Sequence, residues 1–259
     1  MIHQLAFVHP DAKIGNNVTI EPFTTIEGNV VIGEGTVIHS NAVVMNGARI
    51  GKNCQIFPGA VVSAIPQDLK FKGEETTAEV GDNTIVRECV TINRGTVAKG
   101  KTIVGNNCLL MAYSHIAHDC IIGNNVIIGN ATQLAGEVEV DDFAIISGGT
   151  LVHQFGRIGA HVMIQGGSRI SKDIPPFVTA GREPIAYCGI NSIGLRRRGF
   201  SNEEISSIQD IYRYLYMSGM NNTAALEKIE EELPATKYRE QIVGFIKNSE
   251  RGILRGWSD

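Results

Sequence analysis

The sequence has few aromatic residues, no paired cysteines and no excess of basic residues. Phe, Trp and Tyr together make up 6% of the 259 residues, whereas there are 29 glycines. This composition argues against a core built on large rings and favours small aliphatic side chains joined by many tight turns. The net charge of −4 argues against nucleic acid as a partner.

Two further absences bear on where the protein works. No stretch approaches the roughly 18 consecutive apolar residues that a membrane span needs. Residues 1–10 lack the basic start and apolar run of a secretory signal. The five cysteines are odd in number and form no Cys-x-x-Cys pair. We therefore expect reduced thiols in a cytoplasmic protein that does not cross a membrane.

What the chain has in abundance is a six-residue repeat. Steps of six from Val8 to Ile170 give 28 positions, of which 25 are Ile, Val or Leu; the exceptions are Asp68, Glu74 and Ala98. Gly often follows the aliphatic residue, and a small residue often stands four places after it. A period of six fits neither the alternation of a single strand nor the 3.6 of an α-helix. It is typical of a parallel β-helix built from hexapeptides.

Each hexapeptide predicts one short strand and one turn, and three of them make a triangular coil of roughly 18 residues. Successive coils then stack about 4.8 Å apart as paired strands, with the aliphatic side chains pointing into the prism. We expect the glycine after each aliphatic residue to permit the backbone conformation of the corner without a Cβ clash. Because no single coil buries its own face, the stability is a sum of stacking contacts.

The repeat is interrupted twice and then ends. Residues 64–78 replace about two hexapeptides and return in frame, and residues 97–103 form a shorter interruption. Both predict loops extruded from a coil, and such loops are often functional. We expect the β-helix to cover residues 1–176, a linker with a nucleotide-binding segment to cover 177–200, and a small helical domain to cover 201–259.

Three helices are predicted in the last segment. Ser201 to Glu204 form a capping box, and Gly219 is a helix terminator. Apolar residues at helical spacing around Leu226 and Ile242 indicate two more helices. We expect this domain to cover the end of the coil.

Three of the seven histidines are candidates for chemistry. His118 and His153 are 35 residues apart, close to two coils, so both are expected near one corner; His115 lies three residues before His118. One interpretation is a zinc site shared across trimer faces, as in the gamma-class carbonic anhydrases. The other is a lone general base that takes a proton from a sugar hydroxyl as it attacks a thioester. The ordinary alternative is a solvated surface histidine.

Two other groups of residues have an ordinary structural interpretation. Cys54, Cys108 and Cys120 fall four places after an aliphatic residue, where small residues pack, so we expect core side chains rather than nucleophiles. The three arginines at 196–198 form either a solvated turn or a clamp for phosphate, because guanidinium binds phosphate through two parallel hydrogen bonds.

Several motifs together resemble one known family. Over residues 8–200 the chain is similar to the acyl-ACP–UDP-N-acetylglucosamine O-acyltransferases of lipid A synthesis, and its helical tail agrees in kind. The motifs are Gln67-Asp68-Leu69-Lys70, His115-Ile116-Ala117-His118-Asp119-Cys120, Gln133-Leu134-Ala135-Gly136, Val140-Asp141-Asp142-Phe143-Ala144-Ile145, Val152-His153-Gln154-Phe155 and Leu195-Arg196-Arg197-Arg198-Gly199-Phe200.

The resemblance implies a left-handed parallel β-helix and a homotrimer with active sites in the grooves between adjacent β-helices. It implies that His118 is the general base that deprotonates the glucosamine 3-hydroxyl and that Asp119 holds the imidazole. The backbone N–H of Gly136 would stabilise the oxyanion, an effect typically worth roughly 3 kcal/mol. The implied substrate contacts are Gln67, Asp68, Lys70, His115, His153 and Gln154, with Asn191, Arg197 and Arg198 binding the uridine diphosphate.

The implied partners are an acyl carrier protein, UDP-N-acetylglucosamine and further copies of the chain. The carrier's own phosphopantetheine holds the acyl group, so no cofactor and no metal are expected in this chain. Arg94, Lys99, Lys101 and Lys172 are candidates for docking the acidic carrier. Gly166 is small, which favours a deep groove and a long acyl chain.

The sequence departs from the family pattern at several positions. Asn93 stands where a His is common, Glu137 where a His often follows the oxyanion glycine, and Ile193 replaces an acidic residue near the nucleotide. Residues 181–188, which help to set acyl length in the family, also diverge. The predicted base is unaffected, but the acyl length and the choice between a hydroxyl and an amino acceptor stay open.

Four other kinds of β-helix protein are alternatives to this family. The sister N-acyltransferase carries an extra domain before its hexapeptides, whereas here the repeat begins at Val8. Coenzyme A-dependent acetyl- or succinyl-transferases lack the motifs around His118 and Arg198. In a zinc-dependent carbonic anhydrase the ligands are more widely spaced than His115 and His118. A purely structural β-helix would not need a base, a basic clamp and two loops within the same repeat.

Overall fold

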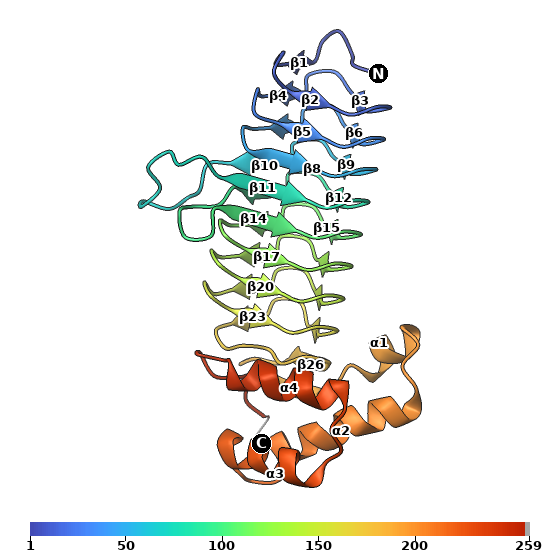
Figure 1. The fold of residues 1–259 in the computed structure, drawn as a ribbon, viewed down its shortest axis with the longest axis vertical. Coiled ribbons are helices and arrows are strands. Elements are labelled where there is room, and N and C mark those ends of the chain that lie inside the picture. Colours follow the sequence, from blue (N-terminus) through green and yellow to red (C-terminus); the bar gives the residue numbers. More distant parts are fainter. Residues whose placement is uncertain (257–259) are drawn as a thin grey trace.

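The computed structural model describes residues 1–256 as a three-sided prism of parallel strands with helices at its C-terminal end (Figure 1). Short strands follow one another around the prism, and each pairs in parallel with the strands one coil before and after it. In Figure 1 the front strands run from left to right while the chain descends, which is a left-handed winding. The predicted parallel β-helix followed by helices is confirmed.

Three sheets form the sides of the prism. The first consists of β1 (Phe7–Val8), β4 (Thr25–Ile26), β7 (Val43–Val44), β10 (Val61–Ala64), β13 (Thr91–Asn93), β16 (His115–Ile116), β19 (Gln133–Leu134), β22 (Leu151–Val152) and β25 (Arg169–Ile170). The second consists of β2 (Lys13–Ile14), β5 (Val31–Ile32), β8 (Ala48–Ile50), β11 (Thr77–Val80), β14 (Lys101–Val104), β17 (Ile121–Ile122), β20 (Glu139–Val140) and β23 (Arg157–Ile158). The third consists of β3 (Thr19–Ile20), β6 (Val37–Ile38), β9 (Gln55–Ile56), β12 (Ile85–Val86), β15 (Leu109–Leu110), β18 (Ile127–Ile128), β21 (Ile145–Ile146), β24 (Met163–Ile164), β26 (Val178–Gly181) and β27 (Ala186–Ile190).

The register shows where the coil is interrupted. Phe7 lies opposite Thr25, so an uninterrupted coil has 18 residues. Val61 lies opposite Thr91, so one coil holds 12 extra residues. Thr91 lies opposite His115, so the next coil holds six extra residues. The extra residues form a long loop at 65–76 and a short loop at 94–100, and both leave the corner between the first and second sheets. The short loop begins and ends three residues earlier than predicted, because Lys101–Val104 pairs as β14.

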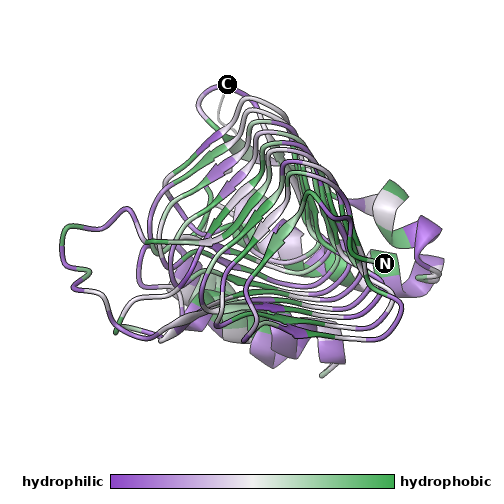
Figure 2. Ribbon diagram, turned by 90° about the horizontal axis from the view of Figure 1, so that it is seen from above, coloured by the Kyte–Doolittle hydropathy of each residue, from purple (hydrophilic) through white to green (hydrophobic). Residues whose placement is uncertain are grey.

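The core is the interior of the prism. The aliphatic residues of the repeat point inward, and examples such as Ile26, Ile38 and Ile56 are completely buried. The small residues four places later, such as Ala42 and Cys54, are equally buried and fill the corners. Figure 2 looks down the prism and shows its triangular section, with the long loop standing out from one corner.

The glycine that follows the aliphatic residue lies against the backbone of the next coil. A Cβ on Gly33 would lie 2.5 Å from the backbone carbon of Gly51, and one on Gly105 would lie 2.5 Å from the oxygen of Gly123. Neither glycine has a positive φ. The positive φ falls two residues later, on residues such as Asn17 (φ 56°), and Asn tolerates this conformation. The expected Cβ clash is confirmed, because the next coil approaches the glycine closely, whereas the glycine itself does not adopt a positive φ.

The segment predicted as a linker after residue 176 contains regular structure. β26 continues the third sheet parallel to β24, and β27 returns antiparallel to β26. A short helix, α1 (Ser192–Arg197), follows. Below this sheet end lie α2 (Asn202–Met217), α3 (Asn222–Glu232) and α4 (Lys237–Lys247), as Figure 1 shows.

The predicted helices and the first helix cap are confirmed. The side chain of Ser201 accepts from the Glu204 N–H, and the Glu204 side chain accepts from the Ser201 N–H. α2 buries Ile208 and Tyr212 completely and packs on β27. No helix within residues 1–256 is long and apolar enough to cross a membrane.

Candidate active site

The corner between the first and second sheets brings most of the predicted site residues together. His118, Gly136 and Gln154 each occupy the same turn position in successive coils, after β16, β19 and β22. Backbone hydrogen bonds tie these turns to one another: Glu137 N–H donates to His118 O at 2.9 Å, and Phe155 N–H donates to Gly136 O at 3.1 Å. Both inserted loops leave this corner in the two preceding coils.

His118 and Asp119 form a buried pair. The imidazole Nδ1 of His118 lies 2.8 Å from Oδ2 of Asp119. His118 is 8% exposed, and Asp119 is completely buried. The other contacts of the Asp119 carboxylate all come from donors: Thr96 N–H and Lys99 N–H donate to Oδ1, and the Thr96 hydroxyl donates to Oδ2 at 2.6 Å. The carboxylate therefore acts as an acceptor, and Nδ1 of His118 carries the proton, which leaves the Nε2 lone pair free.

The long loop approaches the other side of the imidazole. Oδ2 of Asp68 lies 3.8 Å from Nε2 of His118. The loop is held at its base by Asn93, whose side-chain amide donates to Ile65 O at 3.2 Å. The Arg94 guanidinium lies 5.4 Å above the ring centre of Phe71. Both loops that interrupt the repeat therefore end near His118. The long loop approaches its ring with Asp68, and the short loop contacts Asp119, the partner of its Nδ1.

Gly136 lies directly against the imidazole of His118. A Cβ at this position would lie 2.5 Å from both Cε1 and Nε2 of His118, so any larger residue would collide with the ring. Among residues 1–256 the chain provides no hydrogen-bond acceptor for the Gly136 N–H. The imidazole and this unpaired N–H thus lie on adjacent turns of one corner, which suits a base placed beside an oxyanion donor.

His115 stands beside this corner on the outer face of the first sheet. Its Nδ1 lies 2.7 Å from the hydroxyl of Thr91, the neighbouring residue in the previous coil. Burial, and secondarily the charge of His118, lower the pKa of His115. A neutral imidazole at this position can both donate and accept a hydrogen bond.

The remaining predicted contacts of this corner are more open. His153 is exposed, and its Nδ1 lies 3.0 Å from Gln154 O. The same oxygen accepts from Nη1 of Arg251 at 3.2 Å, which brings the C-terminal segment to the corner. Gln67 and Lys70 are exposed on the long loop.

The residues predicted to bind the nucleotide lie at a different corner, between the second and third sheets. The Asn191 side chain caps α1 by accepting from Gly194 N–H at 3.1 Å, and it donates to His161 O at 2.9 Å. Arg198 Nη2 donates to Phe143 O at 3.0 Å, while its buried Nη1 has no partner within residues 1–256. Arg197 is exposed. The structure does not bring these residues to His118 within one chain.

A cavity of about 380 Å³ lies beside Arg198. Its wall includes His161, which stacks on Phe143 with ring centres 4.9 Å apart. Burial, and secondarily the charge of Arg198, lower the pKa of His161 to about 4. Burial also lowers the pKa of Arg198. The cavity therefore presents a guanidinium and a neutral imidazole, whose buried Nδ1 is likewise unpaired within the part of the chain described.

Gly166 lies at the third corner, between the third and first sheets. A Cβ there would lie 3.0 Å from Gly148 O, so the position tolerates little side-chain volume without adjustment. The three corners thus carry the predicted base, the predicted nucleotide contacts and the predicted acyl-length residue separately.

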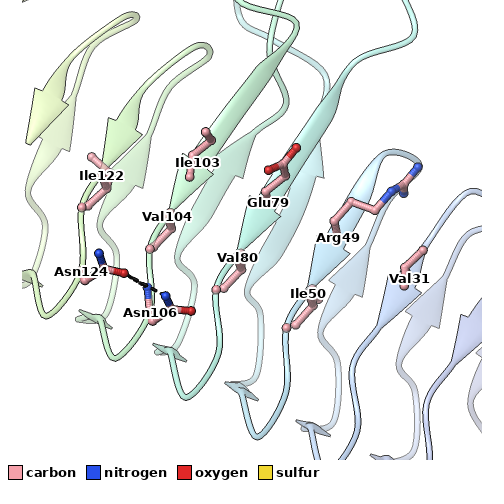
Figure 3. Close-up of a pocket in the computed structure, with 14 residues that line it drawn as sticks. Val31, Arg49, Ile50, Glu79, Val80, Ile103, Val104, Asn106, Ile122 and Asn124 are labelled. Atoms are coloured by element: carbon pink, nitrogen blue, oxygen red, sulfur yellow. Dashed lines mark hydrogen bonds between the residues drawn. The ribbon is translucent and has the colours of Figure 1, made fainter.

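A second cavity lies away from these residues. It is a trough of about 510 Å³ along the edge of the second sheet, lined by residues of β5, β8, β11, β14 and β17 (Figure 3). Figure 3 shows Arg49 and Glu79 on its rim beside Ile103. None of the predicted site residues lines it.

The structure also bears on two alternatives from the sequence. Within residues 1–256 of one chain, no three His, Cys, Asp or Glu side chains are grouped to hold a metal ion. The three cysteines of the repeat are buried, and burial raises the pKa of Cys120 to about 12. They are core side chains, as predicted.

Sequence reasoning missed Thr96. This residue is 6% exposed and gives the Asp119 carboxylate both its N–H and its hydroxyl. The only available signal was its place immediately before the short interruption of the repeat, and spacing alone could not show that this loop folds back onto Asp119.

The chain matches known families along most of its length. Residues 11–46, 29–64 and 101–136 match the bacterial transferase hexapeptide repeats, and residues 173–254 match the second domain of UDP N-acetylglucosamine O-acyltransferase. The chain is 47% identical over 255 residues to the acyl-[acyl-carrier-protein]–UDP-N-acetylglucosamine O-acyltransferase of Thiobacillus denitrificans, covering 98% of this chain and 99% of that one. The protein of the same name from Aliivibrio fischeri is 50% identical over 262 residues, covering 98% and 100%.

Solved structures of similar proteins have the same fold. LpxA, a UDP-N-acetylglucosamine acyltransferase from Bacteroides fragilis, has a TM-score of 0.96 at 62% identity, covering 98% of this chain and 100% of that one. The UDP-N-acetylglucosamine acyltransferase of Francisella novicida has a TM-score of 0.96 at 44% identity, covering 98% and 94%. Because this likeness in sequence and fold extends over nearly the whole of each chain, the protein belongs to the family of acyl-[acyl-carrier-protein]–UDP-N-acetylglucosamine O-acyltransferases.

Proposed function

We propose that the chain transfers a 3-hydroxyacyl group from acyl carrier protein to the 3-hydroxyl of UDP-N-acetylglucosamine, the first step of lipid A synthesis, with His118 as the general base. The single observation that carries this is the buried His118–Asp119 pair, whose imidazole lies against Gly136, a residue whose N–H has no acceptor within residues 1–256. The names of the relatives supply the substrates.

The geometry supports the following sequence of steps. Nε2 of His118 takes the proton from the sugar 3-hydroxyl as its oxygen attacks the thioester carbonyl. The Asp119 carboxylate, 2.8 Å from Nδ1, stabilises the imidazolium that forms. The negative charge that develops on the carbonyl oxygen is held by the N–H of Gly136. Collapse of the intermediate expels the phosphopantetheine thiolate, which takes the proton back from His118.

Substrate contacts follow from the places of the other residues. Asp68, Lys70 and Gln67 on the long loop, with His115, His153 and Gln154, surround the sugar and acyl chain. Arg197, Arg198 and Asn191 bind the uridine diphosphate, although Asn191 also caps α1. Gly166, being small, leaves room for a long acyl chain. Since these groups occupy three different corners of one prism, we propose a homotrimer in which corners of adjacent chains meet.

The carrier protein is acidic in this family, so basic side chains near the groove would steer it. All four candidates already have partners: Lys99 pairs with Glu139 at 2.9 Å, Lys101 pairs with Glu79 at 3.5 Å, and Lys172 donates to Arg251 O at 2.5 Å. Arg94 donates to Asn46 O at 3.0 Å. An acidic carrier protein would therefore have to compete with these partners for the basic side chains.

The test is an acyl-transfer assay with UDP-N-acetylglucosamine and a series of 3-hydroxyacyl carrier proteins of increasing chain length. His118→Ala should lower turnover by about 10²–10⁴-fold, the usual effect of removing a general base. His9→Ala is the matched control, because His9 occupies the same kind of corner in the first coil and lies far along the prism from the site. Near-normal turnover by His118→Ala would overturn the assigned base, and no transfer by the folded wild type would overturn the reaction.

A further inference from the structure

The short loop buries the carboxylate of Asp119, which stands at a corner position of its coil. Asp119, Glu137 and Phe155 occupy equivalent turn positions in successive coils, and all three have a positive φ near 60°. Phe155 is 50% exposed, whereas Asp119 is completely buried. The difference arises because residues 94–100 fold over Asp119, and this loop exists only in the coil before it.

Thr96 supplies two of the donors that hold this carboxylate. Its N–H donates to Oδ1 of Asp119 at 3.0 Å, and its hydroxyl donates to Oδ2 at 2.6 Å. The hydroxyl oxygen itself accepts from Ala98 N–H at 3.2 Å. Because a hydroxyl has one proton and this acceptor side is already occupied, the proton is directed to Oδ2. Oδ2 is the same oxygen that contacts Nδ1 of His118.

From this arrangement we propose that Thr96 is a positioning residue: its hydroxyl orients the Asp119 carboxylate so that His118 keeps its proton on Nδ1 and offers Nε2 to the substrate. This rests on the proposed function, because it gives His118 the role of base. Thr96 does not touch the reacting atoms and acts only through Asp119. The backbone of Asp119 is fixed independently, since its N–H donates to the Thr102 hydroxyl at 2.8 Å.

Removing the hydroxyl should therefore have a specific effect. In Thr96→Val the side chain keeps its shape, but Oδ2 loses a donor and the carboxylate can rotate away from Nδ1. We expect turnover to fall by about tenfold, the size expected for one lost hydrogen bond to a charged group. KM for the nucleotide sugar should change less than about twofold, because the substrate contacts remain. Thr96→Ser retains the hydroxyl and should restore turnover.

The decisive readout is the tautomer of His118, measured by ¹⁵N NMR of histidine-labelled protein, with His118→Ala to assign the signal. The wild type and Thr96→Ser should show the Nδ1–H form, and Thr96→Val should gain the Nε2–H form. Thr102→Val is a matched control, since it removes a buried threonine hydroxyl that contacts Asp119 only through the backbone; it should lower thermal stability without changing the tautomer. If Thr96→Val does not fold, Thr96→Ala makes the same test with a smaller side chain.

An unchanged tautomer and turnover in the hydroxyl-free variants would overturn the proposal, as would failure of Thr96→Ser to restore them. The NMR result does not depend on the reaction. If His118→Ala keeps its activity but the tautomer still follows the Thr96 hydroxyl, the proposed role of His118 as the base fails while its positioning by Thr96 stands.

Discussion

At the scale of single residues, the surroundings decide what a side chain does. His118 has its Nδ1 on a buried carboxylate and its ring against Gly136, which suits the proposed role of a proton acceptor. His161 is stacked between Phe143 and Phe177, and burial lowers its pKa to about 4. It therefore remains neutral at any physiological pH and cannot supply a charge. Two histidines of one fold thus have opposite surroundings.

Asp119→Asn tests the pair directly. The NH₂ group of the asparagine would face N–H and O–H donors that now bond to the carboxylate, so these bonds would be lost. The neutral amide also could not stabilise an imidazolium. Turnover should fall by about 10²–10⁴-fold, and the loss of paired buried groups should lower the unfolding free energy by roughly 1–3 kcal/mol. Steady-state kinetics and denaturant unfolding measure the two effects. Turnover within about threefold of wild type would contradict the role of Asp119.

The cysteines give a prediction about pH. Burial raises the pKa of Cys120 to about 12 and also raises the pKa of Cys54. The thiolate is the reactive form, and a raised pKa keeps it scarce until the pH approaches that value. At pH 8 a maleimide should therefore label the exposed Cys188 and leave Cys120 and Cys54 unlabelled, as mass spectrometry of peptides would show. Rapid labelling of Cys120 in the folded protein would contradict the packing described.

At the scale of elements, the coil is uniform and its insertions are local. Two insertions of 12 and six residues leave one corner in consecutive coils, and the strands resume in register after each. The coil tolerates them because a loop at a corner interrupts no strand pairing. The same stacking excludes larger side chains at other positions, above all at the glycines that face the next coil.

Gly33→Ala should be destabilising. A Cβ there would lie 2.5 Å from the backbone of Gly51, and backbone cannot move aside as a side chain end can. The expected loss of unfolding free energy is about 1–3 kcal/mol, measured by denaturant unfolding at fixed protein concentration. Gly244→Ala in α4 is the matched control: nothing lies within 4 Å of its Cβ, so the substitution should stabilise by about 0.5–1 kcal/mol. Equal effects from the two variants would argue against coil-to-coil contact as the cause.

Gly166→Leu tests the acyl-length proposal. The glycine has no positive φ, so a side chain is allowed by the backbone, but it would fill the space at this corner. We expect the preferred 3-hydroxyacyl chain to become shorter, measured by competition between carrier proteins of different chain length. An unchanged preference in a variant with normal thermal stability would remove Gly166 from the acyl site.

At the scale of the whole molecule, one chain holds the residues of the proposed reaction at separate corners. His118 lies at the corner between the first and second sheets, whereas Arg198 lies at the corner between the second and third sheets and contacts Phe143. A trimer that brings different corners of adjacent chains together would join them. Closed three-fold symmetry provides such a contact three times.

Mixed trimers test this arrangement. His118→Ala should lack the base, and Arg198→Ala should show a raised KM for the nucleotide sugar. If each site takes His118 from one chain and Arg198 from its neighbour, random mixing of the two variants restores about one quarter of the sites. Activity at low nucleotide-sugar concentration, measured on co-expressed trimers carrying two tags, should therefore exceed that of either variant alone. No gain over the parent variants would place both residues in the same chain's site.

The sequence by itself determined the architecture. An aliphatic residue every six positions can be buried only by stacking coils, and the capping box at Ser201 marks a helix start through local hydrogen bonds alone. These features depend on neighbours along the chain or on a strict period, so they can be recognised without coordinates. The family resemblance likewise indicated His118 and Asp119 as a pair, and they are adjacent in sequence.

The tertiary structure decided which insertions meet which corner. Thr96 reaches Asp119 from 23 positions away, Asp68 approaches His118 from the previous interruption, and Arg198 contacts Phe143 across 55 positions. Such contacts depend on how many residues each coil contains and on how each loop folds back. The glycine after each aliphatic residue illustrates the same limit, because its cause is the backbone of the next coil. Spacing predicts that coils stack, but only the folded chain shows which atoms then come into contact.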